Sequence, residues 1–356
     1  MSALSHPSPT VPPLAHPLDE GWTLPASWYS DAGVAALERE RIFARTWQYG
    51  GPAEQVAAPG SFMATQAGHI PIVVTRDRAG ILRGFVNVCR HRAYTIARGC
   101  GSRETLQCPY HAWTYELDGS LRKAPRSERE TGFDPADFSL LPVSVDVWGP
   151  FLFVHPDPDA SPLAETLGEL PAIVARSGLD LSTLAFHSHH EVPIDANWKV
   201  ALENYLECYH CPTAHPAFSR LIDVDPDAYV LEGDGPVWSQ YGTARDGSGT
   251  CAFHLVWPAL KINAYPGFDN LSVGPLWPET TGRTTGFLDY FFGTDVDDAW
   301  ARDLIAFDDQ VGREDTALVE SVQRGVAAGL VERGRLLPES ERLIASFQAK
   351  VTASLT

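Results

Sequence analysis

Two pairs of cysteine and histidine residues are the part of this chain best suited to redox chemistry. Cys89 and His91 form the first pair, and Cys108 and His111 form the second, with sixteen residues between the pairs. Two thiolates on one iron and two imidazoles on the other can hold a [2Fe–2S] cluster of raised reduction potential. A structural zinc site accepts the same four ligands, but zinc fingers usually pair Cys with Cys and His with His. The mixed pairs therefore favour an iron–sulfur cluster over zinc.

A second group of candidate ligands follows a helix predicted over residues 195–211, with Asp195 as its N-cap. His210 lies in the last turn of that helix, and Pro212 breaks the helix so that the chain can return His215 to the side of His210. Either histidine alone is more often a satisfied core residue than a ligand. Two His and one carboxylate together would leave the other positions of a non-heme iron open for O2 and water.

The third ligand would come from a long helix predicted over residues 300–328. Two acids, Asp308 and Asp315, interrupt its apolar stripe, which consists of Leu304, Val311, Leu318, Val322 and Val326. An acid on a buried helix face is costly unless it is paired or bound to a metal. Both acids are therefore candidate ligands, and the alternative for each is an ion pair with Arg302 or Arg313.

Two further cysteines form the motif Cys208-x-x-Cys211, which taken alone suggests a dithiol redox pair. A reactive thiol of this kind usually lies at a helix N-terminus, where the dipole lowers its pKa. This pair lies instead at the C-terminal end of its predicted helix. Cys100, which lies between the two Cys-plus-His pairs, is expected to pack. We therefore expect all six cysteines to be reduced or metal-bound.

The predicted elements divide the chain into two domains that would position these ligands. Short β-rich runs separated by Gly and Asp-Gly turns predict an all-β domain over residues 45–158. Residues 21–44 and 159–356 show an α+β pattern, with helices flanking an antiparallel sheet. Residues 1–20 are Pro-rich and are expected to form a mobile arm. Helices are expected at 31–47, 163–177, 195–211 and 300–328, and strands at 70–74, 81–88, 114–117, 151–154, 186–193 and within 237–292.

Composition and charge exclude several classes of function. Lys and Arg total 27 against 45 Asp and Glu, a formal charge of −18, so neither nucleic acid nor an anionic membrane is an expected partner. No apolar run approaches the ~18 residues of a membrane span, and the N-terminus lacks the features of a secretory signal, so a cytoplasmic location is expected. No Gly-x-Gly-x-x-Gly motif follows a strand, which predicts that electrons arrive from a separate protein.

The residues around the first four ligands, 87–92 (NVCRHR) and 108–115 (CPYHAWTY), resemble the two cluster-binding boxes of Rieske domains. Residues 197–216 (NWKVALENYLECYHCPTAHP) and 314–325 resemble the mononuclear iron segments of Rieske oxygenase α subunits. This resemblance implies an all-β Rieske domain beside a helix-grip catalytic domain, with a [2Fe–2S] cluster, a mononuclear Fe(II) and O2 as co-substrate. It assigns the third iron ligand to Asp315, with Asp308 as the fallback.

The same resemblance implies a homotrimer served by a separate NAD(P)H-dependent reductase. Glu207 matches the carboxylate that links the cluster ligand His111 of one subunit to the iron ligand His210 of the next. Most ring-hydroxylating members have Asp there, and Glu is similar to the branch that oxidises quaternary ammonium compounds such as carnitine, choline, glycine betaine and stachydrine.

On this interpretation, the oxygenase hydroxylates or oxidatively demethylates or cleaves a small quaternary ammonium substrate. Aromatic faces would bind the cation, each with roughly 0.5 to 2 kcal/mol, and the candidates are Phe253, Trp257, Tyr265, Phe268 and Trp277. The alternative within the enzyme class is an oxygenase that hydroxylates an aromatic ring or O-demethylates an aryl ether. Two hypotheses from other classes of protein are an electron carrier that holds only the Rieske cluster and a binding module with a structural zinc site. Both would lack the second metal site. Iron content separates these hypotheses, since the oxygenase should hold three irons per chain, the carrier two and the zinc module none.

Overall fold

The computed structural model describes residues 11 and 18–356, which form two compact units. The first unit contains residues 43–175 and 180–182, and the second contains the described residues up to 42 together with 176–179 and 183–356. The predicted arm over residues 1–20 lies mostly outside the described residues. The boundary predicted at residue 158 precedes two short helices, α2 (Leu163–Leu167) and most of α3 (Leu170–Arg176), which group with the first unit.

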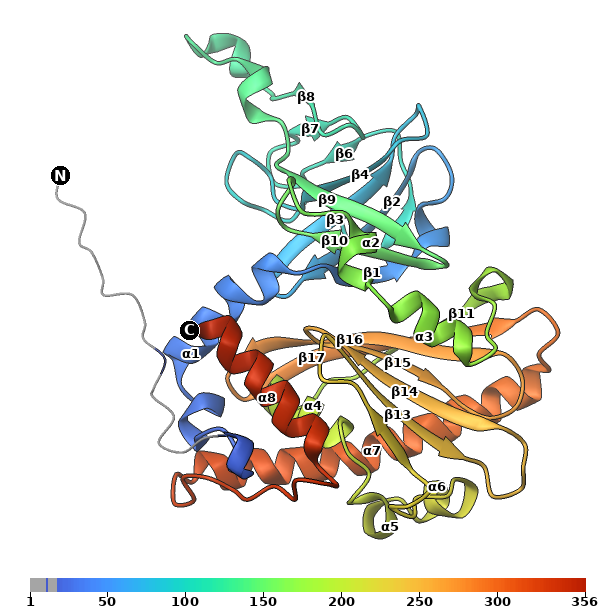
Figure 1. Ribbon diagram of the computed structural model, residues 1–356. Coiled ribbons are helices and arrows are strands. Elements are labelled where there is room, and N and C mark those ends of the chain that lie inside the picture. The colour runs from blue at the N-terminus through green and yellow to red at the C-terminus, as the bar shows by residue number, and fades with distance from the viewer. Residues whose placement is uncertain (1–10, 12–17) are drawn as a thin grey trace. The chain divides into compact units, whose positions relative to one another are not determined.

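The first unit is built on a seven-stranded antiparallel sheet in the order β1-β10-β9-β4-β3-β2-β5 (Figure 1). β-Branched residues fill its core, as in the fully buried run Ile72, Val73 and Val74. A second sheet joins β6 (Leu106–Gln107), β7 (Thr114–Tyr115) and β8 (Leu121–Lys123). The strands of the larger sheet are β1 (Gln48–Pro52), β2 (Ser61–Ala67), β3 (Ile70–Arg76), β4 (Leu82–Val86), β5 (Cys100–Ser102), β9 (Pro142–Trp148) and β10 (Phe151–His155).

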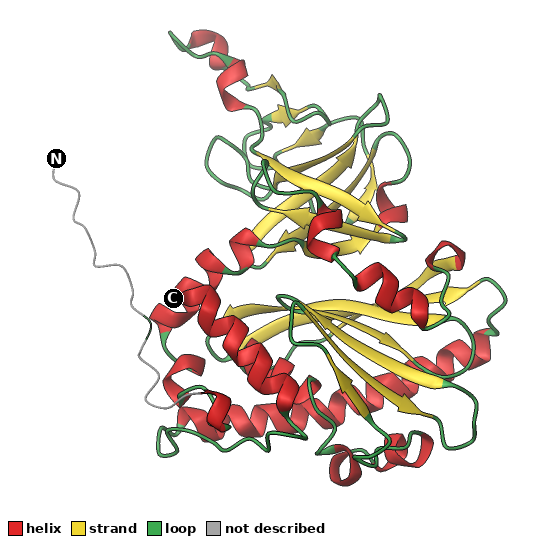
Figure 2. Ribbon diagram, in the orientation of Figure 1, coloured by secondary structure: helices red, strands yellow, loops and turns green. Residues whose placement is uncertain are grey.

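The second unit contains another seven-stranded antiparallel sheet, in the order β11-β17-β16-β15-β14-β13-β12, with helices beside it (Figure 2). Its strands are β11 (Leu184–Glu191), β12 (Val230–Glu232), β13 (Val237–Thr243), β14 (Thr250–Val256), β15 (Leu260–Ala264), β16 (Asn270–Thr280) and β17 (Arg283–Gly293). Its helices are α1 (Ala32–Arg41), α4 (Trp198–Tyr205), α5 (Cys211–Ala214), α6 (Pro216–Leu221), α7 (Asp298–Ala327) and α8 (Arg342–Leu355). The predicted α+β fold is confirmed. Among the residues that the structure describes, no helix is both long and apolar enough to cross a membrane.

The long helix α7 packs on β17, where Ala301 and Ile305 join a buried cluster with Leu288, Tyr290 and Phe292. Its N-cap is Asp297, whose side chain accepts hydrogen bonds from the first backbone N–H groups of the helix. The predicted apolar stripe is partly wrong, because Leu318 and Val322 are 36% and 51% exposed. The buried positions are Ala301, Ile305, Asp308, Val319 and Gln323, which lie on one face along the helix, beside the predicted stripe.

Helix α4 is shorter than the helix predicted over 195–211. Its N-cap is Asn197, which accepts a hydrogen bond from the Lys199 N–H at 3.0 Å, and not Asp195, which is exposed and pairs with Arg283. The helix ends at Tyr205, so Glu207 and His210 lie in the loop before α5 and do not share a helix face. The loop itself brings them together, because Glu207 Oε2 accepts a hydrogen bond from the His210 N–H at 3.1 Å.

A buried ion pair holds α4 against α1. Lys199 on α4 is 0% exposed and Glu38 on α1 is 1% exposed, and the Lys199 ammonium donates to Glu38 Oε1. The other oxygen of Glu38 accepts from Trp198 Nε1 at 2.9 Å. Loss of one partner from such a pair typically costs about 3–5 kcal/mol, because the remaining charge stays buried. The start of the ligand-bearing segment is therefore rigidly placed.

Candidate active site

Two loops of similar conformation carry Cys89, His91, Cys108 and His111. In each loop the cysteine N–H donates to the carbonyl five residues later, and the N–H of an alanine, Ala93 or Ala112, donates back to the cysteine carbonyl. The two alanines have positive φ angles of 54° and 59°, which turn each chain sharply after its histidine. The loops bring the rings of His91 and His111 to a centroid distance of 4.6 Å.

The burial of these four side chains fits a Rieske cluster. Cys89 and Cys108 are 3% and 1% exposed, whereas both histidines lie at the surface. The Tyr115 hydroxyl contacts Cys89 Sγ at 3.3 Å and accepts a hydrogen bond from the Arg90 N–H at 3.0 Å. Burial raises the pKa of the Cys108 thiol, so a bound metal is needed to stabilise the thiolate. Cys100, on β5, is an exposed free cysteine and not the packed residue that we expected.

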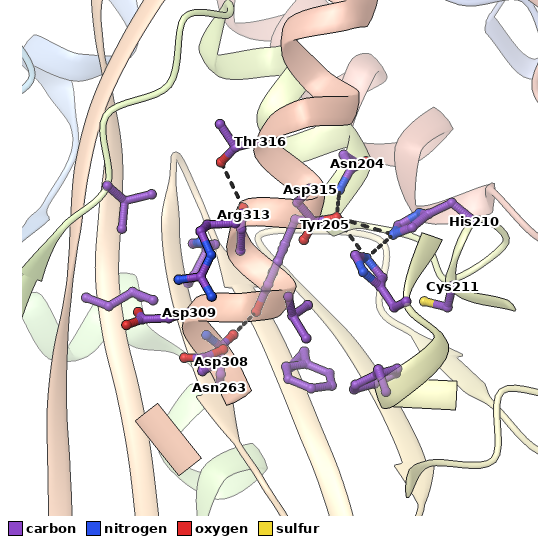
Figure 3. A pocket seen from close by; sticks show the side chains of 18 of the residues that line it. Asn204, Tyr205, His210, Cys211, Asn263, Asp308, Asp309, Arg313, Asp315 and Thr316 are labelled. Atoms are coloured by element: carbon purple, nitrogen blue, oxygen red, sulfur yellow. Dashed lines mark hydrogen bonds and ion pairs between the residues drawn. The ribbon is translucent and has the colours of Figure 1, made fainter. Parts of the chain in front are cut away.

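The second unit brings together His210, His215 and Asp315. Their ligand atoms all lie within 4.8 Å of one another, and Figure 3 shows His210 and Asp315 directed at the same point. His215 Nε2 lies 3.1 Å from His210 Nε2 and 3.0 Å from Asp315 Oδ1, and His210 Nε2 lies 3.4 Å from the same oxygen. Two ligands bound at right angles and about 2.1 Å from one ion would be about 3 Å apart. The three residues therefore fit a single metal ion with two His and one carboxylate as ligands.

Carboxylates hold the other nitrogen of each imidazole. Glu207 Oε1 contacts His210 Nδ1, and Glu314 Oε2 lies 2.7 Å from His215 Nδ1. Such partners fix the tautomer and the ring orientation, leaving Nε2 of each histidine for a metal. Sequence reasoning identified Glu207 but missed the role of Glu314, which its position beside Asp315 could have suggested. It also missed Asn204, whose side chain donates to Asp315 Oδ1 at 2.7 Å.

The structure leaves the fallback ligand, Asp308, outside this group. Its carboxylate accepts hydrogen bonds from Tyr265 at 2.7 Å, Tyr290 at 2.9 Å and Ser272 at 3.1 Å. Burial raises the pKa of Asp308 against the opposing effect of these hydroxyl groups. The alternative, an ion pair with Arg302 or Arg313, is not formed by either acid among the described residues. The hydrogen bonds of Asp308 thus come from three hydroxyl groups, and Lys261 adds a favourable charge interaction at longer range.

The charges of the second site predict a pH-dependent metal affinity. Burial disfavours the His210 imidazolium, but hydrogen bonds to Asp315 and Glu207 outweigh burial and raise its pKa to about 9. The metal-free site is therefore protonated at neutral pH, and Fe(II) must displace that proton. We expect the apparent Fe(II) affinity to rise about tenfold from pH 7 to pH 8 and to level off above about pH 9. Anaerobic competition with a chelator measures this, and an affinity constant over that range would contradict the prediction.

The motif Cys208-x-x-Cys211 forms a disulfide, so the expectation that all six cysteines are reduced or metal-bound is wrong for this pair. The Cα atoms of the two residues are 5.0 Å apart, where the chain passes from the loop after α4 into α5. Both residues lie in a buried cluster with Phe218 and Phe253.

A cavity of about 450 Å³ opens onto the three candidate ligands. Of the five aromatic residues proposed to line it, Phe253 and Tyr265 do so, whereas Trp257, Phe268 and Trp277 do not. Three further aromatic residues of the wall, Tyr205, Phe218 and Tyr229, were missed. Tyr205 and Phe218 flank the two histidines in the sequence, and this closeness could have indicated them.

Comparison with known proteins defines the class. Residues 46–144 match the model of the Rieske [2Fe-2S] domain, and residues 181–253 and 242–356 match that of the ring hydroxylating alpha subunit, catalytic domain. The chain belongs to the Rieske non-heme iron oxygenases, as an oxygenase α subunit. As a member of that family it uses a Rieske cluster, a mononuclear iron and O2, and it receives electrons from a separate protein.

Particular relatives are similar over nearly the whole chain. Choline monooxygenase of Amaranthus tricolor is 32% identical over 93% of this chain and 77% of its own length. The carnitine monooxygenase oxygenase subunit of Escherichia coli K12 is 33% identical over 90% of this chain and 89% of its own. The quaternary ammonium Rieske monooxygenase CntA, solved with L-carnitine, has a TM-score of 0.85 at 31% identity over 95% of this chain and 97% of that one. Naphthalene 1,2-dioxygenase from Rhodococcus, at 20% identity and a TM-score of 0.80, shares the fold.

Proposed function

We propose that Cys89, Cys108, His91 and His111 hold the Rieske cluster, and that the group of His210, His215 and Asp315 holds the mononuclear iron. When bound, the two metal groups supply electron storage and O2 activation, respectively. Support comes from two buried thiols beside two exposed imidazoles in one unit, and from three converging ligand atoms in the other. Glu207 and Glu314 orient the two iron-binding imidazoles, and Asn204 orients the carboxylate.

We propose further that Glu207 carries electron transfer between subunits of a homotrimer. Its carboxylate contacts Nδ1 of the ligand His210, so only Glu207 and His210 would separate the iron from a second imidazole bound to the other side of the carboxylate. The partner imidazole would be His111 of a neighbouring subunit. A CntA structure is described as showing inter-subunit electron transfer, which supports the same arrangement here. The electron source would be a separate NAD(P)H-dependent reductase.

The substrate that the site supports best is a small quaternary ammonium compound. The observation that carries this proposal is a cavity that joins the three iron ligands to an aromatic wall formed by Tyr205, Phe218, Tyr229, Phe253 and Tyr265. A quaternary ammonium has no hydrogen-bond donor, so aromatic faces are its natural binding partners. The relatives named for choline and carnitine oxidation support this choice. Hydroxylation of an N-methyl group would release formaldehyde and the demethylated amine.

A single-turnover assay tests this function. The iron-loaded protein is reduced chemically, freed of reductant and mixed with O2 and one candidate substrate, and the products are then quantified. We expect an aldehyde or hydroxylated amine from carnitine, choline or a betaine, at a yield near one per active site. Aromatic acids serve as the control substrates. A ring alcohol or phenol from those acids, with no product from the amines, would retain the metal sites and reject the ammonium substrate.

A further inference from the structure

A lysine side chain lies in the wall of the substrate cavity. Lys261 is on β15, and the alternating residues Asn263 and Tyr265 that follow it also line the cavity. Its ammonium lies 5.5 Å from the centre of the Tyr205 ring. Burial lowers the pKa of Lys261, while the negative charges of Asp308 and Asp315 oppose that shift. The cavity thus contains a cationic group in a wall that also holds aromatic side chains and the carboxylates of Asp308 and Asp315.

No anion of the described chain pairs with this ammonium. Within the described residues, no carboxylate oxygen lies within 4 Å of Lys261 Nζ, which instead lies over the Tyr205 ring. Asp308 is already hydrogen-bonded to three hydroxyl groups. Lys261 is partly buried, and no described carboxylate pairs with it directly. A ligand that brings an anionic group would supply that partner.

The position of Lys261 along the cavity suggests which end of a ligand it meets. Figure 3 shows Tyr205 extending from the region of Asp315 toward Asn263, to which its hydroxyl donates at 2.6 Å. The cavity therefore runs from the metal ligands along Tyr205 to strand β15. A methyl group that is to be oxidised must lie at the metal end, so an anionic group on the same molecule can lie toward β15.

We propose that Lys261 binds the carboxylate of a zwitterionic substrate, a trimethylammonium carboxylate, and so selects it over cationic alcohols such as choline. This inference rests on the proposed function and narrows its substrate class. Lys261 repels the ammonium of either ligand, but only the zwitterion brings a carboxylate whose attraction to Lys261 offsets that repulsion. The aromatic wall receives the ammonium in either case, and the discrimination comes from the lysine.

Equilibrium binding to the holoenzyme tests the assignment with three probes: γ-butyrobetaine, its methyl ester and choline. The ester keeps the ammonium and the carbon chain but lacks the negative charge. Lys261→Met keeps the length of the side chain without its charge, and Lys261→Arg restores the charge. We expect Lys261→Met to weaken γ-butyrobetaine binding about 10- to 100-fold. The ester and choline should bind Lys261→Met as well as, or better than, the wild type, and Lys261→Arg should recover most of the loss.

Unchanged iron content and cluster absorption in Lys261→Met would show that the variant is folded and loaded. An equal loss of all three probes would reveal a packing role and overturn the inference, as would no loss at all. Arg313 also lines the cavity but is exposed, so a larger loss in Arg313→Met would overturn the assignment to Lys261. If the wild type binds choline and the ester but does not bind γ-butyrobetaine, the role of Lys261 is rejected while the proposed function stands. Wild-type binding of none of the three would reject the proposed function as well.

Discussion

Replacement of His210 by alanine is expected to lower the iron content from three atoms per chain to two and to abolish product formation. His210 supplies one of three converging ligand atoms, and the two that remain, from His215 and Asp315, leave the ion weakly held. Removing a residue that only hydrogen-bonds to a metal ligand typically lowers metal affinity or activity 10- to 100-fold. Removing a ligand itself should therefore lower activity at least about 100-fold. Iron analysis and the single-turnover yield measure the two effects.

The cluster provides the internal control for this variant. Its four candidate ligands lie in the other unit, so the visible absorption of the cluster should be unchanged in His210→Ala. Asp315→Ala should behave like His210→Ala. Asp308→Asn, which keeps the shape of the fallback residue, should retain three irons. Three irons in His210→Ala, or two in Asp308→Asn, would show that the second site is wrongly assigned.

Glu207→Gln is expected to keep three irons per chain and to slow oxidation of the cluster about 100-fold. Glutamine has nearly the same shape and can still accept a hydrogen bond from His210 Nδ1, so the imidazole should stay oriented. It lacks the charge that would hold a second imidazole on its other side. The cluster is first reduced, and O2 and substrate are then added. The rate at which the absorption of the oxidised cluster returns measures electron transfer directly.

Glu314→Gln is the matched control, because Glu314 contacts Nδ1 of the other iron-binding histidine. Glu314 should orient His215 without taking part in electron transfer between subunits. The Glu314→Gln variant should therefore slow cluster oxidation less than about tenfold at saturating iron. Equal rates in the two variants would mean that Glu207 only positions its histidine. Loss of iron from Glu207→Gln alone would lead to the same conclusion.

The family, the α+β fold and the two cofactors could be predicted because their signals are local. Cys89 and His91 are two residues apart, and His210 and His215 are five apart with a proline between them. Over so few residues, loop geometry alone decides which side chains can meet. The strands that were predicted and the long helix overlap those of the structure, since periodicity and turn residues reflect the conformation of the nearby chain. Other strands, among them β1, β2 and β9, were not predicted.

Local patterns failed where a helix end or a helix face depended on distant contacts. The helix predicted to continue to residue 211 ends at Tyr205, and a disulfide joins Cys208 in the loop that follows to Cys211, the first residue of α5. Leu318 and Val322 looked like core residues because they are apolar, yet they are exposed. Hydrophobicity shows that a residue can be buried, but the packing of neighbouring elements decides whether it is.

Only the tertiary structure could distinguish Asp315 from Asp308 by contact. Both acids lie on one helix about 100 residues after the histidines, and its apolar periodicity does not distinguish them. Only the family resemblance favoured Asp315. The register of the seven-stranded sheet places three hydroxyl groups against Asp308 and leaves Asp315 facing the two imidazoles. The aromatic wall and Lys261 follow from the same register, because side chains that meet across a cavity come from strands and helices far apart in the chain.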